Sequence, residues 1–532
     1  MDFAADRQEL DRQNFRPLGG MLRLFVVGFL LATSGCTPLP EWLHNGLKVG
    51  PNYVKPMAPV ELHWIDYGRD SRISESPVNT CAWWTVFNDP VLNGLIETAA
   101  AQNLTLRETG TRILQAQAAA GIAAGNLFPQ VQQAFGSYDR IQLSKTIANS
   151  PPVKNYNLLS TGLGASWEID FWGRYRRALE AADASLDATI EGYDNVLVIL
   201  LSDVASTYVQ IRTLQEELRL VRENVRLQQE SVTIAEAQFN AGQADAADTL
   251  QTRNNVEQTE ALIPQFEAAL RQANNALCVL LGIPPRDLVA ELGEGPIPSA
   301  PPEVALGVPT QLLRRRPDIR QAERIVAAQS ALIGVAESDL YPFFSINGTL
   351  QWQSQNLGTL FNSNSFGGST GPSFGWNILN YGRILNSVRQ QEALFEQAVF
   401  SYQGTVLSAQ REAEDAIVGF LKAQEQTAKL QLAVRDIQEL NQVLLTQANA
   451  GATDFSRVFV VQAAATAQMD SLATSRGSIA LNLIRIYRSL GGGWQIRLQS
   501  PNNFAIPVAV DGAEPIEVPP IPEPLPIPTE DE

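Results

Sequence analysis

Two hydrophobic periods alternate along this chain and indicate where strands and helices form. In residues 159–171 apolar side chains occupy every second position, opposite Ser, Gly, Glu and Asp, as in a strand with one apolar and one polar face. Residues 344–353 and 374–378 show the same alternation, and residues 130–143 show it less regularly. The pattern predicts two strands of about ten residues in each half of the chain, long enough to cross a bilayer when tilted.

After each strand pair the period becomes helical. Mostly apolar residues recur at alternating spacings of three and four, a heptad seam, through residues 211–239 and again through 420–448. No proline interrupts residues 173–240, so the sequence predicts a helix on the order of 100 Å long. Gly242 and Gly451 would end the two long helices, because a sharp reversal favours a residue that tolerates positive φ.

Shorter helices are expected around each long one. A second helix would return from each reversal toward Leu281 or Leu490, and Ala-rich helices would precede the strands at residues 92–126 and 317–339. The order of helix, two strands and helical hairpin therefore occurs twice.

The two halves also superimpose at a fixed offset. The join "WEIDFWGRYRR" corresponds to "WNILNYGRILN", which places Gly173-Arg174 209 residues before Gly382-Arg383. Two further pairs keep this register: Asn240-Ala241-Gly242 with Asn449-Ala450-Gly451, and Leu281-Gly282 with Leu490-Gly491. We interpret the pattern as an internal duplication.

Four amphipathic strands leave two open edges, and lipid does not tolerate unpaired backbone groups. Four strands are also too few to close a barrel, so closure must come from other copies of the chain. Three copies would supply about twelve strands with the polar face inward. The sequence thus predicts a mixed α/β membrane protein with long helical coiled-coil hairpins, in which each Gly-Arg join marks the passage from membrane sheet to water-exposed helix.

The first 36 residues have the character of an export signal. In "MLRLFVVGFLLATSGC" a basic residue precedes an apolar run that is too short for a membrane span and ends in small residues and Cys36. The run resembles a bacterial lipobox, in which Cys36 would be acylated and become the mature N-terminus. The alternative is an N-terminal helix with an incidental cysteine, and translation could start at Met1 or Met21.

Composition excludes several function classes. The net charge of −17 argues against nucleic-acid binding, since phosphate contacts need clustered Lys and Arg. The chain has only His44 and His63 and three distant cysteines, so neither a metal site, a cofactor nor an enzyme activity is expected. Free thiols at Cys81 and Cys278 are favoured over a disulfide. "GPSFG" matches the hydrolase pattern around Ser373, but it lies in a predicted strand and has no downstream histidine.

These patterns divide the chain into six segments. Residues 1–36 form the signal peptide, 37–82 an extended segment, 83–290 the first repeat, 291–316 a Pro-rich linker, 317–492 the second repeat, and 493–532 a Pro-rich acidic tail. "RRRP" at residues 314–317 is interpreted as the entry to a helix that starts at Pro317. The aromatic residues in and beside the strands fit an interfacial girdle better than a ligand cage: Trp167, Trp172, Trp352, Trp376 and Tyr381.

Four stretches carry a family resemblance: "WWTVFNDPVLNGLIETAAAQNL", "DFWGRYRR", "RRRPDIRQAE" and the two "AG" hairpin tips. With them, residues 50–495 resemble TolC-like outer membrane efflux proteins, in particular the NodT/OprM-like lipoproteins that serve RND multidrug pumps. The resemblance implies a homotrimer with a twelve-stranded β-barrel and a periplasmic α-helical tunnel. It also implies a passive conduit, an outer-membrane lipid on Cys36, and docking to a periplasmic adaptor and an inner-membrane RND transporter.

The resemblance places a gate at the helical tips. The acidic residue that the family often carries nine positions past the second tip glycine is replaced here by Val460, and Arg457 lies three residues earlier. Asp245, Asp248 and Asp454 remain as sources of negative charge near the constriction. The alternative function is a periplasmic adaptor or coiled-coil scaffold, which would show one hairpin flanked by compact β-rich domains.

Overall fold

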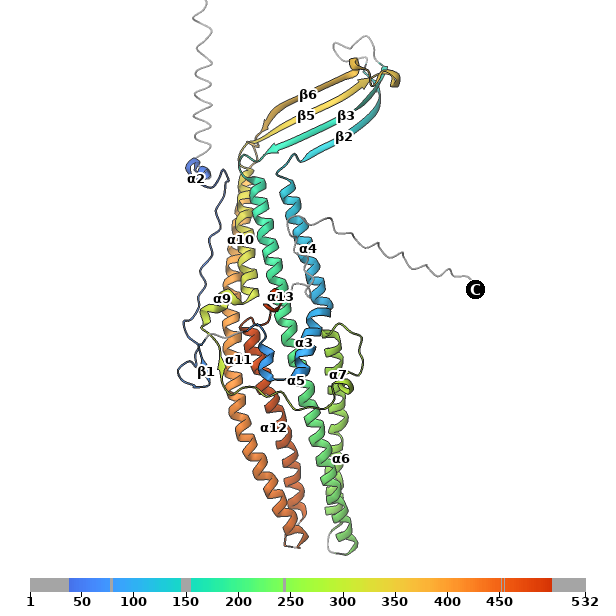
Figure 1. The fold of residues 1–532 in the computed structure, drawn as a ribbon, viewed down its shortest axis with the longest axis vertical. Helices are drawn as coiled ribbons and strands as arrows, with labels where there is room; N and C mark the ends of the chain where they lie inside the picture. Colours follow the sequence, from blue (N-terminus) through green and yellow to red (C-terminus); the bar gives the residue numbers. More distant parts are fainter. Residues whose placement is uncertain are drawn as a thin grey trace, which may run out of the picture.

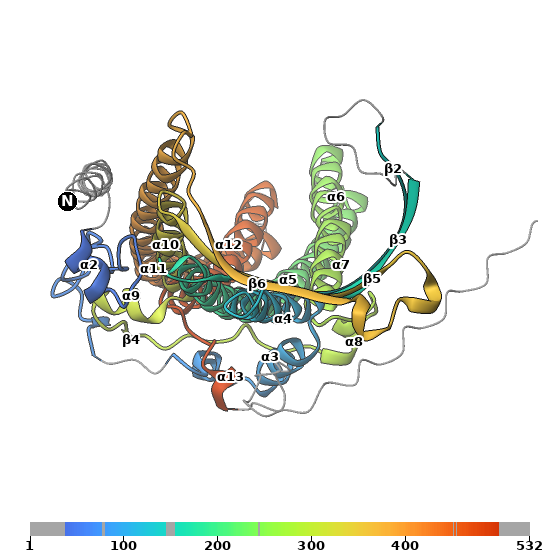
Figure 2. The ribbon, with the colours of Figure 1, turned by 90° about the horizontal axis from the view of Figure 1, so that it is seen from above.

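The computed structural model describes residues 38–76, 80–144, 155–242, 245–450, 452–453 and 455–499. The molecule is elongated, with a curved sheet at one end, helices through the middle and two helical hairpins that end together at the far end (Figure 1). Seen from above, the elements follow an open arc with α10 and α11 at one flank and α6 and α7 at the other (Figure 2). Cys36, Gly451 and Asp454 lie outside the described residues.

The sheet has four antiparallel strands in the order β2-β3-β5-β6. These strands are β2 (Val131–Gln142), β3 (Asn155–Ile169), β5 (Phe343–Ser354) and β6 (Phe366–Gly375). The alternation through residues 374–378 was wrong as a strand boundary, because Trp376 and Ile378 lie beyond β6. Gly375 pairs with Phe343, the first residue of β5, so β6 ends where its partner begins.

Two helices of equal length follow the strand pairs: α5 (Arg174–Asn240) and α11 (Arg383–Asn449), each of 67 residues. Each begins after a glycine with positive φ, 82° at Gly173 and 79° at Gly382. α5 contains an apolar stretch long enough to cross a membrane, but 61% of it is buried inside the protein. That stretch therefore belongs to the helical core.

Two of the expected helices are interrupted. The first returning helix is split into α6 (Ala246–Glu260) and α7 (Leu262–Leu280), because Pro264 cannot hydrogen-bond to the preceding turn and its ring clashes with it. Residues 92–126 form α3 (Pro90–Gln102) and α4 (Leu104–Gly125), and Asn103 caps α4 by accepting from the Leu106 N–H at 2.9 Å. The second returning helix, α12 (Phe455–Ser489), and α10 (Pro317–Ser338) are continuous.

The main core lies at mid-height, where α3, α5, α10, α11 and α12 meet. Its largest fully buried side chains are Trp83, Tyr208, Tyr402 and Phe420. The predicted seam of α5 is buried from Ile211 to Val225, whereas Phe239 near the tip is exposed. A second, smaller apolar cluster around Val458 and Phe459 stabilises the end of the hairpin that α11 and α12 form.

Short elements surround this core. β1 (Ile73–Ser74) pairs in parallel with β4 (Val304–Ala305), so the Pro-rich linker contributes to a two-stranded sheet. The remaining elements are α2 (Leu39–His44), α8 (Leu288–Leu292), α9 (Leu312–Arg315), α13 (Ile496–Gln499), and the 3-10 turns η1 (Trp83–Phe87), η2 (Pro309–Gln311), η3 (Leu357–Thr359) and η4 (Ser363–Ser365).

The "RRRP" motif is structural. Arg316 immediately precedes α10, is buried, and donates to the Ser489 carbonyl at 2.9 Å while it pairs with Asp318 and Glu412. Residues 493–499, the described part of the predicted tail, are also anchored, because Arg497 forms two hydrogen bonds to the fully buried Asp194. No disulfide joins Cys81 and Cys278, as expected.

Candidate functional site

The strand register separates the sheet into two chemically different faces. Leu163 pairs with Leu350, Phe344 with Phe374, and Trp352 with Phe366. These positions share one face because side chains on one strand alternate and directly paired residues lie on the same side. We call this the apolar face; Leu163, Leu350 and Phe374 are all more than half exposed on it.

The opposite, polar face carries hydrogen bonds that cross the strands. Ser166 donates to the Asn347 side chain at 2.6 Å, and Asn347 donates to Ser373 Oγ at 2.8 Å. Ser345 and Ser373 share a further hydrogen bond of 2.8 Å. Ser373 of the "GPSFG" match is thus part of a sheet surface, as the sequence predicts.

Both edges of the sheet are open. Among the described residues, β2 pairs with β3 alone and β6 with β5 alone. Because the four strands alternate in direction, β6 runs antiparallel to β2. Identical copies placed side by side can therefore continue one antiparallel sheet.

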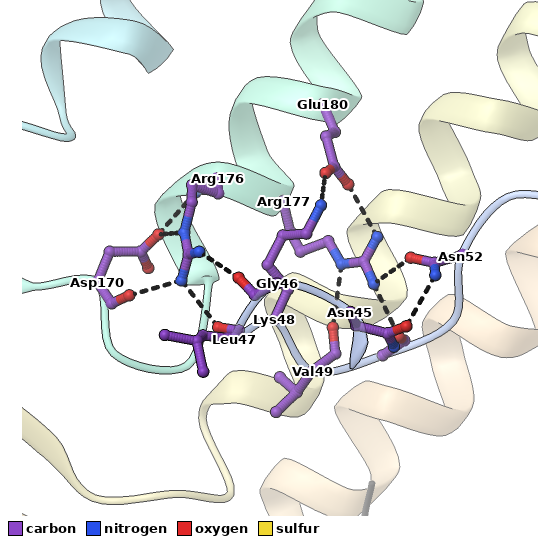
Figure 3. A network of polar contacts seen from close by, with 11 residues as sticks. Asn45, Gly46, Leu47, Lys48, Val49, Asn52, Asp170, Arg176, Arg177 and Glu180 are labelled. Carbon is purple, nitrogen blue, oxygen red and sulfur yellow. Dashed lines mark hydrogen bonds and ion pairs between the residues drawn. The ribbon is translucent and has the colours of Figure 1, made fainter. Parts of the chain in front are cut away.

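At the first Gly-Arg join, acidic and basic side chains organise the turn (Figure 3). Asp170 accepts from the N–H groups of Tyr175 and Arg176 at 2.9 and 3.0 Å, which satisfies free donors in the first turn of α5. The Arg176 guanidinium pairs with the Asp170 carboxylate and donates to the carbonyls of Gly46 and Leu47. Arg174 forms an ion pair with Asp339 at 3.2 Å.

Arg177 attaches the N-terminal chain to the same join. Its side chain is 3% exposed and donates to the carbonyls of Val49 and Gly50 and to Asn52. The Glu180 carboxylate forms ion pairs with both Lys48 and Arg177 (Figure 3). Burial acts to raise the pKa of Glu180, but these two hydrogen-bonded cations lower it below its usual range. Residues 45–61, which we call the strap, then run along α10 and α11, where Lys55 pairs with Glu323 and Gln410 bonds to Pro59.

The second join has a similar backbone and a different environment. Gly382 precedes Arg383, the first residue of α11. Tyr381 also has positive φ, 51°, and its side chain is 96% exposed. Ile378 and Leu379 are exposed beside it.

The strand-end tryptophans fix the sheet to the loops before the strands. The indole N–H of Trp167 donates to the Leu127 carbonyl, that of Trp172 to Pro342, and that of Trp376 to Leu340. Trp352 contacts the rings of Phe361 and Phe366 at the other end of the sheet. The interfacial girdle stays a prediction.

The hairpin tips lie together at the end opposite the sheet (Figure 1). Gly242 has φ of 71°, and Asp245 occupies the N-cap position of α6 without a side-chain capping hydrogen bond. Asp248 lies in the first turn of α6, while Arg457 and Val460 are exposed near the start of α12. The structure thus brings the described tip candidates to one end of the molecule, and their gating role stays a prediction.

Sequence reasoning missed Arg176, Arg177 and the strap. A signal was present: three arginines in the first turn of a helix oppose its macrodipole, and such a position indicates dedicated partners. The acidic Asp170 just before the join pointed to one of them. Among the described residues no cluster of His, Cys, Asp or Glu could hold a metal ion.

An exposed apolar face backed by a polar face, on a sheet with two open edges and a long helical extension, defines a component of a membrane channel. The chain belongs to the outer membrane efflux protein family, whose model matches residues 95–283 and 308–492. The protein is therefore an outer membrane channel of tripartite efflux. This family consists of membrane channels and not of enzymes, and the comparisons do not support the adaptor alternative.

Individual relatives agree along most of the chain. Nodulation protein T of Rhizobium leguminosarum bv. trifolii is 30% identical over 447 residues, covering 83% of this chain and 93% of its own length. The pyoverdine export outer membrane protein OpmQ of Pseudomonas aeruginosa is 28% identical over 479 residues, covering 89% of this chain and 97% of its own length. The structure of the outer-membrane channel OprN is similar with a TM-score of 0.79 and 30% identity, covering 84% of this chain and 99% of that one.

Proposed function

We propose that three copies of this chain form a closed, passive conduit from the periplasm to the exterior. The observation that carries the proposal is the two-faced sheet with its open, antiparallel-compatible edges. Twelve strands would enclose a polar lumen and face lipid with the apolar side, and the helices would continue the wall as a periplasmic tunnel. The duplicated halves would supply equivalent parts of that wall.

Energy and substrate selection would come from partners, because a passive conduit supplies neither. The helical tips would dock to a periplasmic adaptor, which links the channel to an inner-membrane RND transporter. Acylated Cys36, after removal of residues 1–35, would anchor the trimer in the outer membrane. The exported molecules would be drugs or other small molecules.

Single-channel recording in a planar bilayer tests the conduit. Reconstituted protein should give discrete conductance steps that scale with salt concentration, because ions cross a water-filled lumen. Folded protein that inserts but never conducts at any pH or salt concentration contradicts the proposal.

Tip variants test the gate in the same recordings. Gly242 and Gly451 would form the reversals, and Asp245, Asp248, Asp454, Arg457 and Val460 would line the constriction. Val460→Asp should change the open probability and the cation selectivity, since three new charges would lie in a narrow ring. Ser471→Asp, an exposed position further along α12, is the matched control and should change neither.

A further inference from the structure

The N-terminal helix α2 lies beside the base of the sheet, where the helices begin (Figure 1). The ring of Trp42 on α2 is 5.2 Å from Phe171 and 5.5 Å from Trp172, measured between centroids. Phe171 in turn lies 5.5 Å from Phe344, which is on the apolar face of β5. A continuous chain of aromatic contacts therefore joins α2 to the apolar face.

Apolar side chains at this junction face outward. Leu43 on α2 is 56% exposed, Leu47 just after it 40%, and Phe171 42%. A water-soluble protein rarely places such side chains together on one ledge. A contiguous group of exposed apolar side chains marks a site of contact with another protein or with a membrane.

Hydrogen bonds hold the turn that carries these apolar side chains. The chain turns after α2 through Gly46 and Leu47, both with positive φ of 66° and 62°. Positive φ is unfavourable for leucine, and Arg176 fixes this turn by bonding to both carbonyls at 2.6 and 2.8 Å. Arg177 holds the chain just after this turn by donating to the carbonyls of Val49 and Gly50, in the network that Figure 3 shows.

We infer that α2 and the Gly46–Leu47 turn form a membrane-contacting foot, which lies in the headgroup region and presents Leu43, Leu47 and Phe171 to phospholipid acyl chains. The geometry favours phospholipid as the partner of these side chains. They are continuous, through the aromatic contacts, with the apolar face of a sheet in an outer membrane channel. The foot rests on the proposed bilayer-crossing sheet but not on acylation of Cys36. It would fix the height of the bilayer relative to the first Gly-Arg join.

Depth-dependent fluorescence quenching tests this foot in the full chain. A thiol-reactive NBD probe is placed at Leu43→Cys in a Cys81→Ser/Cys278→Ala background, and the protein is reconstituted into phosphatidylcholine vesicles with nitroxide-labelled lipids. An interfacial helix lies about 5–10 Å below the headgroup surface, so shallow nitroxides should quench the probe at least about threefold more than a matched probe at Met57→Cys. Met57 is an exposed strap residue further from the sheet.

Two variants separate the foot from simple tethering. Quenching at residue 43 should persist in Cys36→Ala, and it should fall to the Met57 level in Trp42→Ala, which retains Cys36 but loses the aromatic contacts. Loss of quenching in Cys36→Ala, or protection of the probe by a neighbouring chain without lipid quenching, overturns the inference.

A third probe at Leu350→Cys on the apolar face distinguishes this result from failure of the channel proposal. Deep nitroxides should quench it. Quenching at residue 350 without quenching at residue 43 overturns the foot alone. If residue 350 is not quenched in folded protein, both the bilayer-crossing sheet and the foot are wrong.

Discussion

The two Gly-Arg joins share a backbone and differ in almost everything that surrounds it. Both pass from a strand to a 67-residue helix through a glycine with φ near 80°. At Gly173 the turn is enclosed by Asp170, Arg176 and the strap. At Gly382 the equivalent positions of Asp170 and Arg176 are leucines, Leu379 and Leu385, and both are exposed.

The comparison separates the backbone turn, which the local sequence determines, from the contacts around it, which depend on distant parts of the chain. Glycine at the join fixes the turn in both halves, because its φ is costly for any other residue. The flanking residues decide whether the join receives the N-terminal chain or presents an apolar surface. The second join therefore has the same turn with an uncovered exterior, which a lipid bilayer or a neighbouring chain would cover.

The largest expected difference comes from adding one methyl group at each join. In Gly173→Ala the new Cβ would lie 2.6 Å from Lys48 Cγ and 2.7 Å from Lys48 Cα, so steric displacement of the strap adds to the strain of positive φ. We expect a loss of about 2–4 kcal/mol. Gly382→Ala meets nothing closer than 3.7 Å and should cost about 1–2 kcal/mol from strain alone. Thermal unfolding of the two variants measures this, and equal shifts would contradict the comparison.

Arg177→Ala should release the strap. The change removes the buried guanidinium that donates to the carbonyls of Val49 and Gly50, at a cost of about 2–3 kcal/mol to the local structure. Hydrogen exchange of residues 45–55 should accelerate while that of α11 stays unchanged. Asn386→Ala alters the equivalent, exposed position of the second join and should cost below about 0.5 kcal/mol. Unchanged exchange in Arg177→Ala would show that the strap is held elsewhere.

Asp170→Ala removes the side chain that bonds the first-turn N–H groups of α5. Loss of such a cap costs about 1 kcal/mol, and it also removes the partner of Arg176. Leu379→Ala at the second join removes no hydrogen-bond acceptor and should not lower the stability of the first turn of α11. A comparison of unfolding midpoints in detergent checks both, and a smaller loss for Asp170→Ala would refute the capping role.

The smallest expected effect is a pH dependence confined to the first join. Lys48 and Arg177 lower the pKa of Glu180 in the folded protein. The ionised Glu180 therefore stabilises the fold at pH values above the ordinary pKa of glutamate. This contribution is lost as the pH falls through the lowered pKa. A nitroxide at Val54→Cys should become more mobile at acidic pH. Glu180→Gln should remove this dependence, and a probe at Leu385→Cys should show none, since Arg389 occupies the equivalent position. Equal acid mobilisation at both joins would refute the assignment.

Much of this architecture could be predicted from local patterns. Alternation located three of the four strands, and heptad spacing with the absence of proline located the 67-residue helices. The end of β6 could not be predicted, because it depends on pairing with Phe343. The break at Ala261 was visible in principle, since Pro264 lies in the first turn of α7.

The candidate site was predictable only where a residue acts on its own backbone. Gly173 and Gly382 are such residues. Arg177 acts on residues more than a hundred positions away in sequence, and no local period encodes that contact. The duplication, the domain boundaries and the gating roles of Asp248 and Val460 stay predictions.

Covalent closure of the sheet tests the trimeric wall most directly. Cysteines are introduced on the polar face of both edges, at Ser137 in β2 with Ser369, Gly371 or Ser373 in β6, in a Cys81→Ser/Cys278→Ala background. Oxidation of protein in outer membranes should give, for at least one pair, a ladder of one, two and three chains that stops at three. Cross-links confined to single chains, or a ladder that extends beyond three, would contradict a ring of three copies.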